Sequence, residues 1–452
     1  MMSVKKIYLE WHIFSEEPYP PMHSLSQEDI IMLKKCGVAI LGLGTVGFGT
    51  YQIIENNKAY IKKTQKIDLT VEAVLEINAK RIADCKVSQS ICHTKIEDII
   101  SNSSVDIVVE TIGGIEPAKT LIISALKHGK SVVTANKELL AKHWRELETV
   151  AKQNNVGLYF EASCVGGVPI IRALINSMQA NKILSIYGII NGTTNYILSK
   201  MANEGLSYDE ALSQAQKLGY AEANPKADVE GYDASYKLSI LSSLAFAVNV
   251  PLEKVYREGI TNISITDINY GKDLGYTLKL LAIGKNASNG VEVRVHPTFI
   301  KNNHSLASVN GSYNAVYIVG DCVDDIMLYG KGAGALPTGS AIVSDIIYAC
   351  KEDHFYVPFS GLEKVNFVTD FASDYYIRLT VLDKIGTLAS IAGIFQKNNV
   401  SINDVMQKGC DNEVPIIFIT HKTQENSLNK AILEIKKIPE VIAVNAIIRV
   451  EK

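Results

Sequence analysis

The segment from Leu218 to Leu238, LGYAEANPKADVEGYDASYKL, concentrates side chains that can hold a charged ligand or move a proton. Its four carboxylates and the ammonium group near its end belong to Glu222, Asp228, Glu230, Asp233 and Lys237. A carboxylate can bind a substrate ammonium group, and a lysine can exchange a proton with a hydroxyl group. An exposed acidic loop with one surface ion pair has the same composition. The helices and loops predicted to carry these residues are therefore needed to distinguish the two interpretations.

Two predicted helices flank this segment. Ser207 and Glu210 form a capping box that opens the first helix, which should end at Gly219. The second helix, YDASYKLSILSSLAFAV, places Asp233 and Lys237 four residues apart on one face. Because this second helix is apolar in almost every direction, we expect it to be buried. A buried lysine and a buried carboxylate are costly unless they are paired or used in chemistry.

A glycine-rich turn follows the first predicted strand of the chain, which begins near Gly37. Its glycines have G-x-G-x-x-G spacing, and a helix should start near Thr45; they are Gly42, Gly44 and Gly47. Such a turn lets backbone N–H groups approach a pyrophosphate closely, which indicates a dinucleotide site. A second strand, residues 69–77, ends near Glu76, whose carboxylate could hold a ribose hydroxyl and slightly favours NAD. Lys80 and Arg81 could instead grip the 2′-phosphate of NADP.

Strands and helices alternate along the first third of the chain. The strand at 105–114, the helix at 116–129 and the strand-to-helix segment at 130–141 continue the β-α-β order of a doubly wound sheet. Lys137 follows one of these strand ends, where a cofactor would lie. An exposed lysine at a helix start fits the same position equally well.

The rest of the chain suggests two further domains. An acid and a glycine-rich turn occur in EASCVGGVPIIRAL at 161–174, and the region 291–340 holds short strands and then the start of GKGAGALPTGSAIVSD. Past Phe371 the pattern is β-α-β-β-α-β over about eighty residues, which is a ferredoxin-like plan. We therefore predict an α/β protein with four parts: an N-terminal extension at 1–36, a Rossmann domain at 37–160, a central α+β domain at 161–370 and a ferredoxin-like domain at 374–452. The last helices of the central domain should pack back on the Rossmann sheet.

Composition limits the classes of function. The chain has 452 residues, of which 47% are hydrophobic and 21% charged, and its formal net charge is −3, so we expect a soluble, multi-domain globular protein. Basic blocks with interleaved aromatic residues are absent, which argues against a nucleic-acid or membrane partner. The seven cysteines form no C-x-x-C pair, and no signal peptide or membrane span is evident. A cytoplasmic location is expected.

Five motifs occur in an order that resembles one family. They are GLGTVG, TANK, NGTTNYIL, LGYAEANPKADVEGYDASYKL and GKGAGALPTGSAIVSD. The sequence resembles a homoserine dehydrogenase of the bacterial type with a C-terminal ACT domain, from about Gly37 to the end. The resemblance implies a reversible, NAD(P)-dependent interconversion of L-homoserine and L-aspartate 4-semialdehyde in threonine and methionine biosynthesis. It also implies a homodimer or a homotetramer.

The resemblance assigns roles to particular residues. Glu222 should hold the substrate amino group, Asp233 should bind substrate, and Lys237 should exchange the proton with the carbonyl or hydroxyl oxygen. The residues expected to line the dinucleotide are Gly42, Gly44, Thr45, Val46, Gly47, Lys137, Gly219 and Gly334. A sodium ion should bind at Glu161 and at the backbone of Cys164, Gly166 and Val168. In the ACT domain, the turn from Asp383 to Gly386 precedes a helix and should receive a feedback amino acid, with L-threonine expected.

The proton step leaves one question open. A lysine accepts a proton only when it is neutral, so burial or a second cation such as Lys137 must lower the pKa of Lys237 toward the working pH. Asp233 would oppose that change, and the sequence does not decide which influence is stronger. Asp228 and Glu230 are expected to be solvated loop acids rather than catalysts.

Two rival functions remain at this point. A non-catalytic amino-acid sensor would use the ACT domain alone, but it would not need Lys137, Glu222, Asp233 and Lys237 together. An aspartate semialdehyde dehydrogenase would need a nucleophilic cysteine. Cys164 is the candidate nearest the site, and it falls on the ion-binding turn. The first thirty-five residues depart from the family pattern, and no role is assigned to them.

Overall fold

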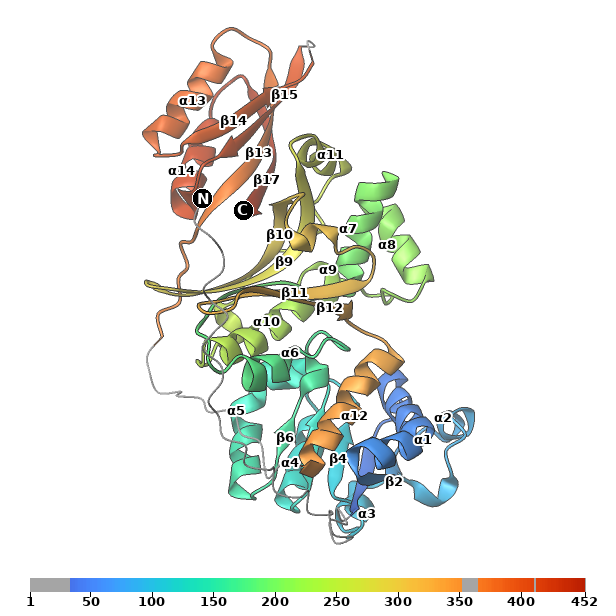
Figure 1. Ribbon diagram of the computed structural model, residues 1–452. Coiled ribbons are helices and arrows are strands. Elements are labelled where there is room, and N and C mark those ends of the chain that lie inside the picture. Colours follow the sequence, from blue (N-terminus) through green and yellow to red (C-terminus); the bar gives the residue numbers. More distant parts are fainter. Residues whose placement is uncertain (1–32, 352–364, 410–411, 452) are drawn as a thin grey trace, which may run out of the picture.

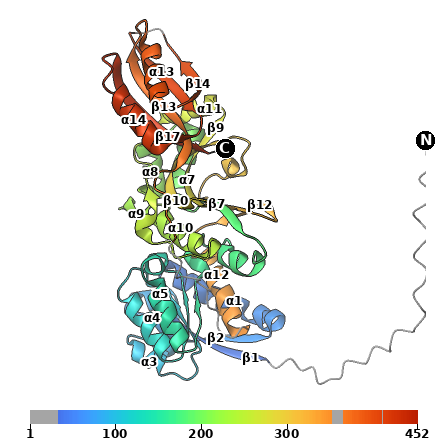
Figure 2. The same cartoon turned by 90° about the vertical axis from the view of Figure 1, so that its left-hand side faces the viewer.

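Three layers of structure are stacked along the long axis of the molecule (Figures 1 and 2). The computed structural model describes residues 33–351, 365–409 and 412–451. Most of the expected N-terminal extension, and Cys410, lie outside these ranges. None of the helices in the described ranges is long and apolar enough to cross a membrane.

The first layer is a six-stranded parallel sheet in the order β3-β2-β1-β4-β5-β6, the doubly wound arrangement that the sequence predicts. Its strands are β1 Lys34–Leu41, β2 Ile67–Leu75, β3 Cys92–His93, β4 Ile107–Glu110, β5 Ser131–Thr134 and β6 Leu158–Tyr159. Its helices are α1 Thr45–Gln65, α2 Ala79–Asp84, α3 Ile96–Ile100, α4 Ala118–Lys127 and α5 Lys137–Gln153. From Cys36 on, β1 is buried and mostly apolar, and β4 is buried throughout, as expected for a sheet covered on both faces.

The second layer is an antiparallel sheet in the order β12-β11-β7-β9-β10, with the short β8 paired to β10. Its strands are β7 Ile183–Ile189, β8 Tyr256–Arg257, β9 Tyr276–Ala287, β10 Gly290–Lys301, β11 Tyr313–Gly320 and β12 Asp324–Lys331. Its helices are α6 Ile170–Arg172, α7 Gly192–Glu204, α8 Tyr208–Lys217, α9 Lys226–Val229, α10 Tyr232–Ala245 and α11 Ile265–Asp273, with a π-helical turn at Ala173–Ser177. Short 3₁₀ turns lie at Gln89–Ile91, Glu161–Ser163, Leu252–Lys254 and Ser305–Ser308.

Helix α12, Ala335–Lys351, returns from the second layer to the first and packs along α1 (Figure 1). Ile342 and Ile346 are fully buried in the same core as Ile40 of β1 and Ile54 of α1. Gly49 of α1 allows this approach, because a Cβ atom there would lie 2.3 Å from the carbonyl oxygen of Ala335. The turn before α12 is therefore held against the glycine-rich start of α1.

The third layer has the predicted β-α-β-β-α-β order. Its elements are β13 Ala372–Leu382, α13 Thr387–Lys397, β14 Ile402–Gln407, β15 Glu413–Thr420, β16 Thr423–Gln424, α14 Glu425–Ile435 and β17 Val441–Glu451. It has a hydrophobic core of its own, in which Phe395 and Phe418 meet edge to face. The sequence does not predict its attachment: β17 pairs in parallel with β10, so the sheets of the second and third layers are continuous.

Candidate functional site

Helix α10 carries the buried lysine and carboxylate that the sequence predicts. Lys237 Nζ donates to Asp233 Oδ2 at 2.7 Å and to the Ile190 carbonyl at 2.8 Å. Lys237 is 8% exposed and Asp233 is 7% exposed, so this is not a surface ion pair. Lys137, the first residue of α5, approaches from the Rossmann layer, and its Nζ lies 3.2 Å from Asp233 Oδ1. One carboxylate is thus shared by two lysines from two layers.

The charges in this cluster determine its protonation. Burial alone would raise the pKa of Asp233, but Lys237 and Lys137 outweigh it and hold that pKa well below its usual range. Asp233 in turn raises the pKa of Lys137 despite the opposing effect of burial. Asp233 is therefore ionised at any working pH, and Lys137 is held as a cation beside it.

Asn191 and Asp228 complete the cluster, and sequence reasoning missed both. Asn191 is the N-cap of α7, and its Nδ2 donates to Asp228 Oδ1 at 2.6 Å and to Asp233 Oδ2 at 2.9 Å. Asp228 lies in α9, a short helix within the predicted loop, and burial followed by Asp233 raises its pKa. The prediction that Asp228 is a solvated loop acid is wrong, because an amide thirty-seven residues away draws it in.

Glu222 and Glu230 are placed differently from Asp228. Glu222 lies in the exposed loop between α8 and α9, where its backbone carbonyl accepts a hydrogen bond from Gln216 Nε2 at 3.1 Å. Among the described residues, the Glu222 carboxylate makes no hydrogen bond or ion pair with this cluster. Glu230 has a side chain that is 38% exposed and lies 4.0 Å from Lys226, which fits a loop acid. Gly219 begins this loop with a φ of +75°.

The glycine-rich turn has the geometry of a dinucleotide site. Gly42 has a φ of +91°, and a Cβ atom at Gly47 would lie 2.0 Å from the Gly42 carbonyl oxygen, so both positions need glycine. A Cβ atom at Gly44 would meet nothing within 4 Å, which leaves the N-terminus of α1 open to a ligand at Thr45 and Val46. Residues of this chain therefore fit a nicotinamide dinucleotide, whose pyrophosphate the backbone of this turn would hold.

Glu76 is fixed beside that turn. Its Oε2 accepts from the backbone N–H of Leu43 at 3.0 Å, and its Oε1 accepts from Asn78 N–H at 2.9 Å. The carboxylate therefore lies at the end of β2, next to the glycine-rich turn. This is the position in which the acid of a Rossmann fold meets a ribose.

A second glycine turn, GKGAG at 330–334, joins the two layers. Gly334 has a φ of +123° and precedes α12. A Cβ atom at Gly166 would lie 2.4 Å from the Gly332 carbonyl oxygen, and Gly167 N–H donates to the Lys331 carbonyl at 3.0 Å. The turn at 164–168 therefore packs directly on the turn that contains Gly334.

The turn at 161–168 fits an ion through its backbone rather than its side chains. The Glu161 carboxylate accepts from the N–H groups of Ile171 and Arg172, both at 2.8 Å, and the Glu161 carbonyl accepts from Cys164 N–H at 3.4 Å. The Val168 carbonyl accepts from Ile170 N–H at 2.8 Å, whereas among the described residues no hydrogen bond ends on the carbonyls of Cys164 or Gly166. Within the described ranges no three His, Cys, Asp or Glu side chains gather to hold a metal. A hard monovalent cation suits such carbonyls.

Cys164 is not a nucleophile in this structure. It is fully buried, its Sγ lies 3.9 Å from the Lys237 carbonyl oxygen, and burial raises the pKa of its thiol to about 12. A thiol with that pKa is not a thiolate near neutral pH, and acyl transfer requires the thiolate. The geometry therefore argues against an aspartate semialdehyde dehydrogenase.

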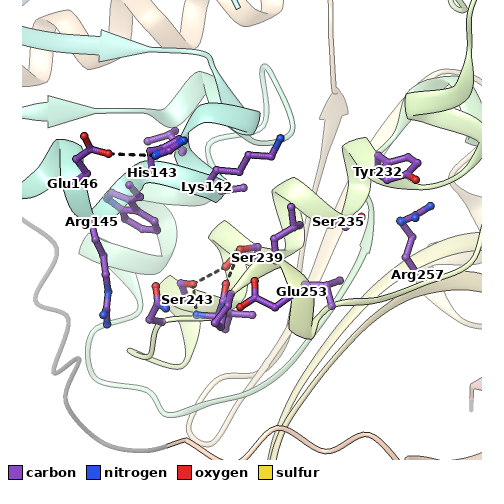
Figure 3. Close-up of a pocket in the computed structure, with 18 residues that line it drawn as sticks. Lys142, His143, Arg145, Glu146, Tyr232, Ser235, Ser239, Ser243, Glu253 and Arg257 are labelled. Carbon is purple, nitrogen blue, oxygen red and sulfur yellow. Dashed lines mark hydrogen bonds and ion pairs between the residues drawn. The ribbon is translucent and has the colours of Figure 1, made fainter. Parts of the chain in front are cut away.

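A cavity of about 940 Å³ lies on another face of α10, between α5 and the segment at 249–257 (Figure 3). From α10 it is lined by Tyr232, Ser235, Ser239 and Ser243, not by Asp233 or Lys237. Ser239 and Ser243 are engaged by hydrogen bonds with Val250 and with each other (Figure 3). This cavity is separate from the lysine–aspartate cluster.

The fold and the site define the class of the protein. A parallel sheet with a glycine-rich turn and an acid after β2 binds a nicotinamide dinucleotide, and a buried lysine–aspartate pair lies where this layer meets the next. These features belong to an NAD(P)-dependent oxidoreductase. Three family models match the chain: "Homoserine dehydrogenase, NAD binding domain" at residues 42–161, "Homoserine dehydrogenase" at 169–347 and "ACT domain" at 375–440.

Comparison with individual proteins gives the family. Homoserine dehydrogenase of Bacillus subtilis is 37% identical over 93% of this chain and 99% of its own length, and that of Helicobacter pylori is 39% identical over 93% and 100%. A crystal structure of the Thiobacillus denitrificans enzyme is 38% identical, with a TM-score of 0.88 over 93% of this chain and 99% of that chain. The chain belongs to the homoserine dehydrogenase family, which confirms the resemblance seen in the sequence.

Proposed function

We propose that Lys237 exchanges the proton with the substrate hydroxyl in the interconversion of L-homoserine and L-aspartate 4-semialdehyde. The observation that carries this assignment is the buried contact of Lys237 with Asp233 at 2.7 Å, at the meeting of the nucleotide-binding and central layers. When bound, NAD(P) accepts a hydride from the carbon that bears the hydroxyl group. Lys237, as the neutral amine, takes the hydroxyl proton, and Asp233 holds the ammonium group that results in place.

The remaining substrate contacts follow from charge. Homoserine has an α-ammonium group, which Glu222 binds from the loop between α8 and α9, with Asp233 as a second anion nearby. Lys137, which Asp233 holds as a cation, begins a helix of the nucleotide-binding layer and would lie between the nicotinamide and the substrate. Gly219 and Gly334, both at turns with positive φ, would line the nucleotide.

The preferred nucleotide is NAD. Glu76 is held beside the glycine-rich turn by two backbone N–H groups, where it would accept from ribose hydroxyls and repel a 2′-phosphate. A hyperthermophilic archaeal homoserine dehydrogenase of 27% identity, with a TM-score of 0.59, has been solved in complex with NADPH, so a phosphorylated nucleotide can be bound by a protein of this fold. We therefore ascribe the preference for NAD over NADP to the carboxylate of Glu76 and the residues around it.

Sodium is the second ligand in this proposal. Its ligands are Glu161 and the backbone of Cys164, Gly166 and Val168, and among the described residues no hydrogen bond ends on the carbonyl oxygens of Cys164 and Gly166. The ion would stiffen the turn that packs on GKGAG. Replacement of sodium by lithium or choline at constant ionic strength should raise KM for the substrate and lower the melting temperature.

The ACT domain supplies assembly and regulation. We place its ligand site at the turn from Asp383 to Gly386, before α13, with L-threonine as the feedback ligand in a homodimer or homotetramer. The domain limits that go with this assignment are 1–36, 37–160, 161–370 and 374–452. Titration with threonine, followed by activity and by thermal melting, tests the regulatory part. An absence of effect on both would leave the domain an assembly module.

The activity itself is tested directly. Purified protein with L-homoserine and either NAD or NADP should increase absorbance at the nicotinamide band, and the reverse reaction should consume NAD(P)H with aspartate semialdehyde. A protein that binds nucleotide and threonine but turns over neither substrate would be an amino-acid sensor. That outcome would reject the proton-transfer role of Lys237.

A further inference from the structure

Asn191 stands where β7 ends and α7 begins, and it is 5% exposed. Its Oδ1 accepts from the backbone N–H and the hydroxyl group of Thr194, both at 2.9 Å, which caps α7. Its Nδ2 donates one hydrogen to Asp228 and the other to Asp233. The whole hydrogen-bonding capacity of this amide is thus used, half for the helix and half for the site.

The Asn191 amide forms a hydrogen-bonded bridge between two carboxylates, Asp228 and Asp233. Asp228 and Asp233 lie close enough that Asp233, after burial, raises the pKa of Asp228. A neutral amide can donate to both carboxylates without adding charge. A lysine at this position would add a third cation beside Lys137 and Lys237, and an aspartate would add a third anion.

The bridge also fixes the rotation of the Asp233 carboxylate. Its Oδ2 accepts from both Asn191 Nδ2 at 2.9 Å and Lys237 Nζ at 2.7 Å, which leaves Oδ1 facing Lys137 at 3.2 Å. The residue before Asn191 adds to this arrangement, because the Ile190 carbonyl accepts a second hydrogen from Lys237. Two consecutive residues of the chain therefore orient both the lysine and its partner.

The amide cannot easily move. Its cap of α7 holds one end, and the following residue, Gly192, is packed so closely that a Cβ atom there would lie 2.8 Å from the Ser312 carbonyl oxygen. The start of α7 is therefore packed against Ser312, the residue that precedes β11. This rigidity is what a group needs in order to position others.

We propose that Asn191 is a positioning residue of the reaction, which holds Asp228 and Asp233 at a fixed separation and so keeps Lys237 in the geometry of proton exchange. This proposal rests on the proposed role of Lys237. It assigns no chemical step to Asn191 itself. The consequence is that its removal should change the chemistry far more than it changes the fold.

Two substitutions separate positioning from capping. Asn191→Ser keeps an N-cap but is too short to bridge the two carboxylates, so we expect kcat for homoserine oxidation to fall about 10- to 100-fold. The melting temperature and the NAD(P) dissociation constant should stay close to wild type. Asn191→Asp keeps the shape and the cap but puts a third carboxylate against Asp228 and Asp233, and its kcat should fall further.

The pH profile gives a readout that a cap alone would not move. The charged groups that face this position are Asp228 from α9, Asp233 and Lys237 from α10, and Lys137 from α5. Homoserine oxidation needs the neutral amine of Lys237, so its rate should rise with pH. An added carboxylate favours the protonated lysines, so this rise should move to higher pH in Asn191→Asp. Asn191→Ser should keep the rise near its wild-type pH at a lower plateau.

A matched control is Ser207→Ala, which removes the N-cap of the neighbouring helix α8 without contacting the site. It should lower the melting temperature and leave kcat and the pH profile unchanged. If both Asn191 variants lose activity only as far as they lose stability, with the wild-type pH profile, Asn191 is a cap and the proposal is rejected. Normal turnover in Lys237→Met would instead reject the role of the lysine, whatever the Asn191 variants do.

Discussion

Lys237 Nζ lies 2.7 Å from Asp233 Oδ2, one turn of α10 apart, with both side chains buried. On a helix surface such a pair would contribute only tenths of a kcal/mol. Here the same spacing places an ammonium group where the nucleotide-binding and central layers meet, and Lys137 shares the carboxylate. The pair is therefore explained by chemistry rather than by helix stability.

The first prediction concerns Lys237→Met, which keeps the apolar stem and removes the group that titrates. Loss of a general acid or base typically costs ~10²–10⁴ in rate. We expect kcat to fall by that amount while nucleotide binding, measured by fluorescence titration, persists. Lys226→Met, at an exposed lysine in the same segment, should leave kcat unchanged. A folded Lys237→Met protein with near-normal kcat would shift the assignment to Lys137.

The second prediction concerns Glu76→Gln, which removes the charge at the ribose end of the nucleotide site. Like charges brought together at an interface cost several kcal/mol, so loss of this carboxylate should raise the NADP-to-NAD ratio of kcat/KM by at least about tenfold. Glu72→Gln, at another acid of β2, is the control and should leave the ratio alone. Steady-state kinetics with both nucleotides decide the matter. A wild-type enzyme that already prefers NADP would contradict the role given to Glu76.

The third prediction concerns the attachment of the ACT domain. Asp267 of α11 is 1% exposed and accepts from Arg378 Nε at 2.6 Å and from the Tyr376 hydroxyl at 2.9 Å, both on β13. Breaking a buried pair by removing one partner costs about 3–5 kcal/mol, so Asp267→Asn should lower the free energy of unfolding by about that much. Urea denaturation measures this change.

Asp273→Asn is the matched control for that experiment. Asp273 also lies on α11 and also pairs with a basic residue of the ACT domain, since Lys408 Nζ lies 2.6 Å from its carboxylate. This pair, however, is about half exposed. Solvent screens such a pair, so its loss should be barely measurable. Equal effects of the two substitutions would show that Asp267 does not anchor the domain.

Local patterns explain what the sequence predicts well. The glycine-rich turn, the capping box at Ser207 and the spacing of Asp233 and Lys237 each depend on residues within a few positions, and the structure has all three. The β-α-β-β-α-β order of the last layer is likewise a local alternation. These features need no knowledge of distant contacts.

Distant contacts explain what the sequence misses. Asp228 is drawn into the site by Asn191, and β17 extends the central sheet by pairing with β10, far earlier in the chain. Neither contact leaves a periodic signal. Only the capping role of Asn191 has a local signal, since an asparagine before an apolar helix is a typical N-cap. The two hydrogen bonds that its Nδ2 donates to Asp228 and Asp233 join residues far apart in the sequence.

The last prediction concerns Lys279, a lysine of β9 outside the site. It is 1% exposed, and its Nζ donates to neutral oxygens: the Val309 carbonyl, Asn310 Oδ1 at 3.2 Å and Asn195 Oδ1 at 3.4 Å. No ion pair within the described ranges includes it, and burial lowers the pKa of Lys279 to about 8. An unfolded lysine titrates near ~10.4.

The sign of the effect follows from proton binding. Between pH of about 8 and ~10.4 the folded protein releases the Lys279 proton while the unfolded chain keeps it, so the unfolded state binds more protons and stability rises with pH. The rise over the whole window should be ~3 kcal/mol, at 1.36 kcal/mol per pKa unit. Below pH 8 the lysine is charged in both states and its contribution no longer changes with pH.

Lys279→Met removes this titration. Urea unfolding of wild type and variant at several pH values between 7 and ~10.5 should give a stability difference, wild type minus variant, that is flat below pH 8 and then grows in favour of wild type. Other titrating groups cancel in that difference, because both proteins share them. Lys301→Met, at an exposed lysine at the end of β10, should give a flat difference throughout. A flat difference for Lys279→Met as well would mean that Lys279 stays protonated in the folded protein, held by the oxygens of Val309, Asn310 and Asn195 strongly enough to offset its burial.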